Sequence, residues 1–181
     1  MDRNAPANVT DDPETGARES DELIGRWHGR GRLTYAITPR FAITSTEAQL
    51  AVAGELLKAH PDCLMQTHLS ESRREIETVR ALFPNDADYT AVYERFGLLG
   101  PTSIFAHGIH LDESECARLA EAGSAVAHCP TSNTFLGSGL FDIDHVGAAR
   151  RPVGVGLATD IGGGTDYSML ATMGEAYKVG M

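Results

Sequence analysis

The 181-residue sequence contains no apolar run near the roughly 18 residues that a membrane-spanning helix requires. Cysteine is scarce too: Cys63, Cys116 and Cys129 are an odd number without Cys-x-x-Cys spacing, so we expect free thiols in a reducing cytoplasm. Basic residues are few, with 15 Lys and Arg against 25 Asp and Glu, and the net charge is −10. This charge argues against binding to nucleic acid or to a membrane surface, because both are polyanionic.

Several common catalytic signatures are also missing. The sequence shows no Ser–His–Asp or Cys–His spacing pattern. The run Gly162-Gly163-Gly164 is not the Gly-x-Gly-x-x-Gly of a dinucleotide site, and no Lys follows it as in a phosphate loop. We interpret this run as a tight turn beside a packed site.

What the sequence does contain is an alternation of short apolar runs and amphipathic segments. With 42% hydrophobic residues, the chain is long enough for one domain over 1–181 with its own core. We predict strands at 33–37, 63–68, 102–106, 124–127 and 153–159. We predict helices at 21–27, 46–60, 72–83, 89–96, 112–123, 143–150 and 167–179. Strands that alternate with helices indicate an α/β fold with a parallel sheet.

Helix starts are marked by residues that cap the free N–H groups of a first turn. Thr46, Ser72 and Asp112 each precede a Glu or Gln by three residues, which is the capping-box pattern. Residues 1–20 are polar and contain two prolines, so we predict a loop there. We also predict a loop for the glycine-containing segment around Asn133.

Side chains capable of chemistry follow the predicted strands. In parallel α/β proteins the carboxyl ends of the strands meet at one edge, where active sites form. Taken singly, each of these residues has an ordinary explanation, such as a hydrogen bond in the core, a turn or a solvated charge. The residues at that edge are Arg40, His68, Glu71, His107, His128 and Asp160.

Together these residues indicate a metal site. Two imidazoles and a carboxylate, from His68, His107 and Asp160, suit Zn²⁺ and also Fe²⁺. Such an ion lowers the pKa of its bound water from about 15.7 towards about 7. Glu71 lies in the turn after His68, where it could carry protons without binding the ion. The sequence thus predicts hydrolysis at an amidine-type carbon of a base.

Five motifs in this order resemble the guanine deaminases of the amidohydrolase superfamily, over nearly the whole chain. The His-Leu-Ser-Glu, Ala-His-Gly and Thr-Asp elements are typical of the superfamily, and the others narrow it to this branch. The motifs are Thr38-Pro39-Arg40-Phe41, Gln66-Thr67-His68-Leu69-Ser70-Glu71, Ala106-His107-Gly108, Ala127-His128-Cys129-Pro130-Thr131-Ser132-Asn133 and Thr159-Asp160-Ile161-Gly162-Gly163-Gly164.

The resemblance implies a TIM-like (β/α) barrel, of which this chain would supply about strands 4–8, and a zinc-dependent aminohydrolase that acts on a purine. It implies that His68 and His107 bind the metal, and that Asp160 holds the metal or its hydroxide. Glu71 would relay protons to the purine ring and to the leaving ammonia. The resemblance further implies four substrate contacts: Arg40 by hydrogen bonding, Phe41 by stacking, and His128 and Asn133 as pocket lining.

One family element is missing from this sequence. The family takes two further ligands from a His-x-His motif on its first strand, and none of the seven histidines here forms that motif. We therefore expect a carboxyl-terminal-half fragment that binds metal weakly and turns over negligibly alone. Half a barrel would leave sheet edges and apolar faces uncovered, so we also expect self-association, such as a homo-oligomer.

Two alternatives stay open at this point. One is another deaminase or chlorohydrolase of the same superfamily, acting on triazines, adenosines or other purines. The other is a barrel half without catalytic activity that serves as an interaction module.

Overall fold

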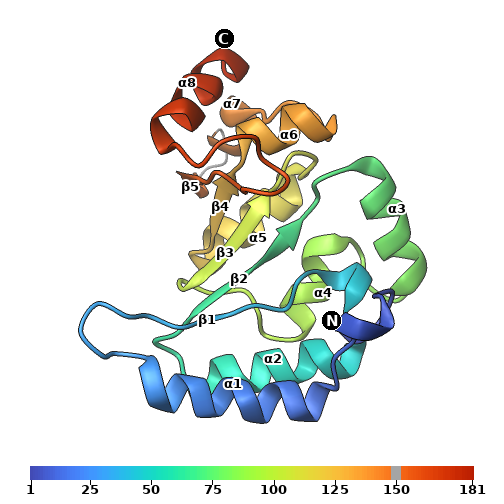
Figure 1. The fold of residues 1–181 in the computed structure, drawn as a ribbon. Coiled ribbons are helices and arrows are strands. Elements are labelled where there is room, and N and C mark those ends of the chain that lie inside the picture. Colours follow the sequence, from blue (N-terminus) through green and yellow to red (C-terminus); the bar gives the residue numbers. More distant parts are fainter. Residues whose placement is uncertain (148–151) are drawn as a thin grey trace.

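The computed structural model describes residues 1–147 and 152–181, and five parallel strands within them form one sheet in chain order (Figure 1). The strands are β1 (Ala36–Ile37), β2 (Leu64–Leu69), β3 (Ser103–His107), β4 (Ala125–His128) and β5 (Gly154–Leu157). The helices are α1 (Pro13–Trp27), α2 (Glu47–Ala59), α3 (Arg73–Leu82), α4 (Tyr89–Arg95), α5 (Glu113–Ala122), α6 (Pro130–Leu136), α7 (Ile143–Gly147) and α8 (Met169–Val179). Short 3-10 turns lie at Ala7–Val9 and Ala42–Thr44. The predicted α/β fold with a parallel sheet is confirmed.

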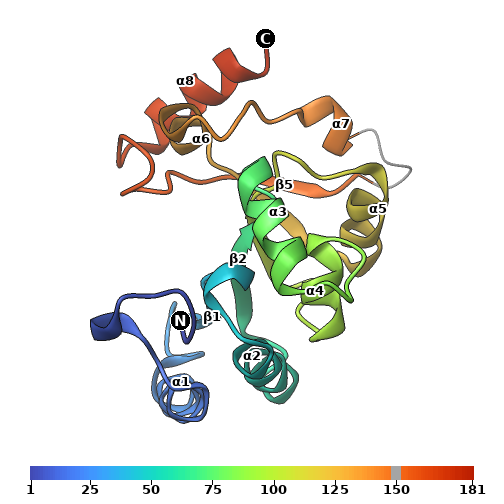
Figure 2. The same ribbon diagram turned by 90° about the vertical axis from the view of Figure 1, so that its right-hand side faces the viewer.

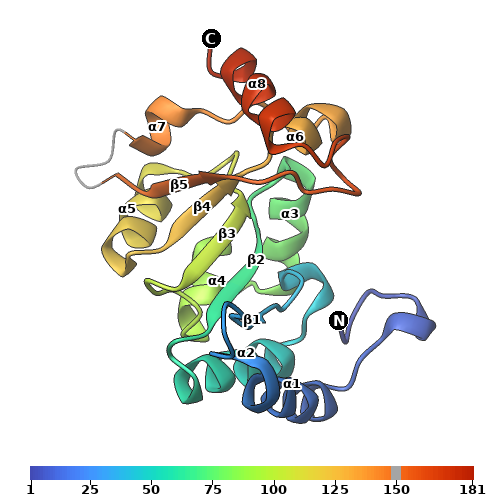
Figure 3. The same ribbon diagram turned by 60° about the vertical axis from the view of Figure 1, so that its left-hand side comes forward.

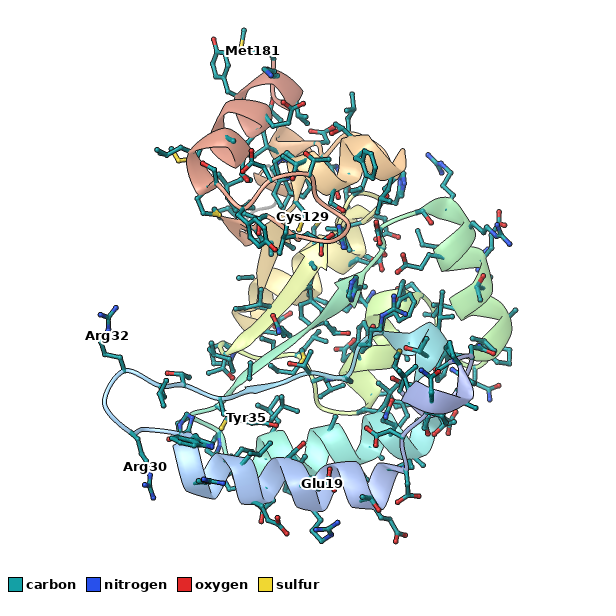
Figure 4. The ribbon with its side chains drawn as sticks, in the orientation of Figure 1. Glu19, Arg30, Arg32, Tyr35, Cys129 and Met181 are labelled. Carbon is teal, nitrogen blue, oxygen red and sulfur yellow. The ribbon has the colours of Figure 1, made fainter. Side chains whose placement is uncertain are left out.

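The register of the sheet brings the carboxyl ends of the strands together. Leu69 on β2 lies opposite His107 on β3, and His128 on β4 lies opposite Leu157 on β5. Figure 4 shows Cys129, directly after β4, at this end, whereas Arg30 and Arg32 lie on the loop before β1. The residues that follow β1 to β5 therefore share one edge of the sheet.

Alternate side chains of the central strands are buried. Met65 and Leu69 on β2, Phe105 on β3 and Val126 on β4 belong to one hydrophobic core. The residues between them are more exposed and face the other side of the sheet. Figure 2 shows α3, α4 and α5 together on one side of the sheet. The two-residue period of each strand thus separates the helix-covered face from an open face.

The three predicted capping residues, Thr46, Ser72 and Asp112, are confirmed by the hydrogen bonds of their side chains. The Ser72 hydroxyl accepts the Glu75 N–H, and the Thr46 hydroxyl accepts the Gln49 N–H. Asp112 and Glu115 form a reciprocal capping box at the start of α5. Each cap satisfies N–H groups that have no partner inside the first helical turn.

The structure corrects two predictions of loop. Residues 13–20 are not a loop but the first part of α1, because Asp12 caps the helix and Pro13 takes its first position, where proline is favoured. Likewise, Asn133 lies in α6, which has Pro130 at its first position but no side-chain cap, and which ends at Leu136 before the left-handed Gly137. The first strand, β1, is shorter than the predicted 33–37. The predicted helix at 143–150 corresponds to α7, and its residues 148–150 lie outside the described part of the chain.

The end of the described chain leaves apolar surface uncovered. All four residues of β5 are exposed, and α8 packs beside α6 (Figure 3). Exposed apolar side chains gather on these three elements, and we call this set the β5–α8 face: Phe135, Leu136, Val155, Leu157, Leu170, Met173 and Tyr177. Large exposed apolar surfaces often mark a contact with another structure.

Among the described residues, no helix combines the length and hydropathy needed to cross a membrane.

Candidate active site

The edge formed by the strand ends brings the predicted residues into one region. His68 lies on β2, His107 ends β3, and their rings stack with centroids 5.3 Å apart and planes at 28°. Asp160 follows β5, and a cavity beside it is lined by His68, Arg40 and Asp160 itself. The prediction that these side chains share one edge of the sheet is therefore confirmed.

His68 is oriented by the main chain of a neighbouring segment. Its Nδ1 lies 2.7 Å from the Arg40 carbonyl oxygen, and its backbone N–H donates to the same oxygen. A carbonyl can only accept, so Nδ1 carries the proton and Nε2 keeps its lone pair. Burial lowers the pKa of His68, which favours the neutral imidazole that a metal ion requires.

His107 is oriented in the same way, but by a side chain. Only 1% of His107 is exposed, and its Nδ1 lies 2.9 Å from Oδ1 of Asn133. Its Nε2 is buried and has no hydrogen-bond partner among the described residues. The nearest carboxylate oxygen, Oε2 of Glu71, lies 3.6 Å away. A buried nitrogen left without a partner is costly unless it binds something, such as a metal ion.

Glu71 has its two carboxylate oxygens in different environments. Oε1 accepts a hydrogen bond of 2.8 Å from the Ser138 hydroxyl, in the loop after α6. Oε2 faces His107 Nε2. One oxygen is thus fixed while the other points towards the imidazole, which suits a group that moves protons.

Asp160 sits in a turn that only glycines can complete. Its own φ is +46°, in the left-handed region, and the Gly164 N–H donates to its carbonyl oxygen. A Cβ on Gly164 would lie 1.9 Å from the Thr159 carbonyl oxygen, and one on Gly163 would lie 2.8 Å from Asp160 Oδ2. The glycine run is therefore a tight turn packed against Asp160, as its composition predicts.

A cavity of about 360 Å³ opens beside these residues, within the usual range of about 300–1,000 Å³ for small-molecule sites. The Arg40 guanidinium lies over the Phe41 ring at 4.6 Å, and the Phe41 ring lies 5.4 Å from that of His68. The cavity is lined by Thr38, Arg40, Gln66, Thr67, His68, Ile104, Ala106, Ala127, Cys129, Ala158, Thr159, Asp160 and Ile161.

Of the four predicted substrate residues only Arg40 lines this cavity, whereas Phe41 lies beside Arg40 and His68, and His128 and Asn133 are buried. His128 is buried and stacks on Phe141 at 4.6 Å, and burial together with His107 lowers the pKa of His128 to about 4. Asn133 is buried and bonded to His107. Contact of His128 or Asn133 with substrate stays a prediction, and the positions of both favour a supporting role.

Two further residues support the site and were not predicted. Ser138 holds Glu71, and its place between two glycines of a loop was the one available signal. Tyr93, fully buried on α4, donates to the His68 carbonyl oxygen at 2.8 Å and accepts from the Ala42 N–H at 3.0 Å. Nothing in the sequence around Tyr93 distinguishes it from an ordinary core aromatic.

The donor set at this edge fits a metal ion. The two Nδ1 atoms are held by oxygen acceptors, so both Nε2 lone pairs are free, and Asp160 adds a carboxylate. His68, His107 and Asp160 do not, however, bring three ligand atoms within 4.8 Å of one another. His68, His107 and Asp160 therefore do not form a closed ligand set by themselves.

Among the described residues, one cluster does bring three ligand atoms within 4.8 Å of one another. It consists of His28, Asp62 and Cys63 and lies before β2, at the opposite end of the sheet. His28 uses both ring nitrogens there, since Nδ1 accepts the Tyr35 N–H at 3.1 Å and Nε2 lies 3.0 Å from Asp62. These bonds tie the end of α1 to the start of β2. We interpret this cluster as structural.

Comparisons with known proteins agree with this geometry. The chain is 50% identical to guanine deaminase from Escherichia coli (strain K12) over 179 residues, 99% of this chain and 40% of that one. The structure of the E. coli enzyme matches with a TM-score of 0.96. Guanine deaminase from C. acetobutylicum with bound guanine matches at 30% identity and a TM-score of 0.92, covering 99% of this chain and 42% of that one.

An adenosine deaminase from Xanthomonas campestris with bound zinc is more distant, at 26% identity and a TM-score of 0.83, covering 96% of this chain and 38% of that one. The chain thus spans about 40% of the length of the relatives it matches. The predicted resemblance to guanine deaminases and to a TIM-like barrel is confirmed. The model of the amidohydrolase family matches residues 2–181. This chain belongs to the amidohydrolase family.

Proposed function

We propose that this chain supplies one half of the active site of a guanine deaminase, which converts guanine and water into xanthine and ammonia. The observation that carries the proposal is the juxtaposition of Glu71 Oε2 and the unpartnered, buried Nε2 of His107, 3.6 Å apart. That pair combines a metal-ligand atom with a carboxylate free to move protons. The likeness to guanine deaminases at up to 50% identity supports guanine as the substrate.

Arg40 and Phe41 are the residues suited to hold the purine. The guanidinium of Arg40 lines the cavity, and its fork of donors matches the O6 and N7 acceptors of guanine. Its position over the Phe41 ring restricts how it can point.

Zinc is the ion we propose for the site, with His68, His107 and Asp160 as ligands. When bound, such an ion supplies a water activated at neutral pH. Glu71 would take one proton from the attacking water and pass it to a ring nitrogen of the purine as the new C–O bond forms at the carbon that bears the amino group. It would then carry the second proton of that water to the amino group, which leaves as ammonia when the C–N bond breaks. Ser138 keeps the carboxylate aimed throughout, because its hydrogen bond occupies the oxygen that does not face His107.

The 181 residues alone should perform this reaction poorly. Two imidazoles and one carboxylate do not form a closed ligand set here, so we expect weak zinc binding and negligible turnover by the isolated chain. Robust turnover by the monomeric chain would contradict the view that the site needs ligands from outside it.

A segment exchange tests the proposed activity directly. The matching 179 residues of the E. coli enzyme would be replaced by this chain, and xanthine and ammonia would be measured. We expect guanine deamination, a loss of about 10²- to 10⁴-fold in kcat for Glu71→Gln, and weaker guanine use for Arg40→Ala. A folded, zinc-loaded exchange protein that prefers an adenosine or a triazine would refute the assignment.

We further propose a cytoplasmic location and association through the β5–α8 face. The three cysteines are free and buried, which fits a reducing compartment. The exposed apolar side chains of β5, α6 and α8 favour contact with another chain or with another part of a longer chain. Light scattering on the purified chain measures this association.

A further inference from the structure

A hydrogen bond joins the side chain of Asn133 to that of His107, although the two residues lie 26 positions apart in sequence. We propose that Asn133 is a positioning residue that fixes the tautomer and the ring orientation of His107, so that Nε2 is presented to the ion. The inference rests on the proposed metal site for its consequence, but the hydrogen bond itself is independent of any substrate.

Burial shows that Asn133 acts through His107 rather than through substrate. Only 1% of Asn133 is exposed, and it does not line the cavity beside His68. Its Oδ1 lies 2.9 Å from His107 Nδ1. An amide oxygen accepts only, so this contact requires a proton on Nδ1 and leaves Nε2 as the ligand atom.

The main chain of Asn133 is held on both sides, which makes it a stable support. Its N–H donates to the Cys129 carbonyl oxygen at 2.9 Å within α6. Its carbonyl oxygen accepts the Ser138 N–H at 2.9 Å. The Ser138 hydroxyl in turn holds Glu71. The end of α6 therefore orients both the proposed ligand and the proposed proton carrier.

His68 shows the same arrangement with a different acceptor. There the Arg40 carbonyl oxygen takes the Nδ1 proton at 2.7 Å, and a main-chain group cannot be removed by substitution. At His107 the acceptor is a side chain, so a single substitution tests it. His107 is therefore the histidine whose tautomer the substitution should change, and His68 is an internal reference in the same molecule.

Nitrogen NMR of the ¹⁵N-labelled chain measures the tautomers without metal or substrate. Above the ordinary imidazole pKa, we expect the protonated nitrogen to be Nδ1 in both His68 and His107. In Asn133→Ala we expect His107 to shift towards the Nε2-protonated form, which can donate to Glu71, while His68 stays unchanged. Asn133→Asp keeps an acceptor oxygen and should preserve the Nδ1 tautomer. Thr134→Ala, an exposed change on the same helix outside the β5–α8 face, is the matched control.

Cobalt titration gives the second readout, because the d–d spectrum reports the ion directly. We expect Asn133→Ala to weaken Co²⁺ binding by about 10- to 100-fold, and Asn133→Asp to stay close to the unsubstituted chain. An Nε2-protonated His107 in the unsubstituted chain would overturn the proposal. The proposal would also be overturned if Asn133→Ala had the same His107 tautomer and the same Co²⁺ affinity as the unsubstituted chain.

These outcomes are separable from the proposed deaminase activity. If the tautomers and Co²⁺ affinities follow the expectation but the exchange protein does not deaminate guanine, the positioning role stands and the substrate assignment fails. If Asn133→Ala does not fold, the tautomer of the unsubstituted chain and the comparison with Asn133→Asp still decide the question.

Discussion

The hydroxyl of Tyr93 connects three segments behind the site, and Tyr93→Phe removes that connection alone. The hydroxyl donates to the His68 carbonyl oxygen at 2.8 Å, accepts the Ala42 N–H at 3.0 Å and lies 3.2 Å from the Thr67 hydroxyl. The phenyl ring remains, so its packing against Phe105, with ring centroids 5.7 Å apart, is preserved. The substitution therefore isolates the hydrogen bonds.

The expected loss in the free energy of unfolding depends on the buried groups that would lose the Tyr93 hydroxyl as their hydrogen-bond partner. Ala42 is fully buried, so its N–H would lose its partner without gaining water. An unsatisfied buried group costs about 1–3 kcal/mol, whereas Thr67 keeps the Arg40 carbonyl oxygen as acceptor. We expect the free energy of unfolding to fall by about 2 kcal/mol. With a urea m-value of about 2 kcal/mol per M, the midpoint would shift by about 1 M.

Urea unfolding followed by circular dichroism measures this shift. Tyr177→Phe is the matched control, because Tyr177 is 70% exposed on α8 and should change stability by less than about 0.5 kcal/mol. If Tyr93→Phe is as stable as the control, the Tyr93 hydroxyl does not hold the turn at Ala42–Thr44 and β2 together, and the reasoning is refuted.

Three further predictions concern other parts of the chain. Burial raises the pKa of the Glu75 carboxyl from 4.5 to about 7, so the free energy of unfolding should fall by up to about 3 kcal/mol as the pH rises between these values. Urea unfolding at about pH 5 and about pH 8 measures this fall, which Glu75→Gln should abolish. Gly164→Ala should open the turn beside Asp160 and weaken Co²⁺ binding at least about 10-fold, whereas Gly174→Ala, with open space on α8, should not. Leu170→Glu should reduce association through the β5–α8 face in light scattering, and an unchanged oligomer would exclude that face.

Local patterns predicted the elements of this fold well. The capping residue Ser72 begins α3, and the apolar runs that end on His68, His107 and His128 are β2, β3 and β4. Caps and strand periodicity depend on neighbours within a few residues, so a sequence exposes them. The same local reasoning predicted a loop for residues 1–20, because that segment is polar and contains prolines, and it missed that Asp12 caps a helix with Pro13 at its first position.

Local sequence patterns could not predict the hydrogen bonds that support the site. Asn133 meets His107 across 26 residues, and Ser138 meets Glu71 across 67. Each contact depends on how α6 is placed over the ends of β3 and β4, which no local period encodes. The sequence could name the groups that perform chemistry, since their types are restricted, but not the residues that aim them.

Strand periodicity alone would place His68 and His107 on opposite faces of the sheet, and this expectation is wrong. His68 lies opposite Ala106 in the register, so an extended His107 would point to the buried face, away from His68. Yet their rings stack at 5.3 Å, because His107 leaves extended geometry with a φ of +73°. Ser70 and Asp160 are also left-handed, and such residues cost about 1–3 kcal/mol each.

The surrounding bonds explain why this strain persists. The Gly108 N–H donates to the Leu69 carbonyl oxygen, and the His110 N–H donates to that of Ser70, so the chain after β3 is tied to the end of β2. The strained residues Ser70, His107 and Asp160 therefore lie at the sheet edge that also holds His68 and Glu71. Relaxing the backbone at His107 would return its side chain to the buried face of β3, and the stacked rings of His68 and His107 would separate.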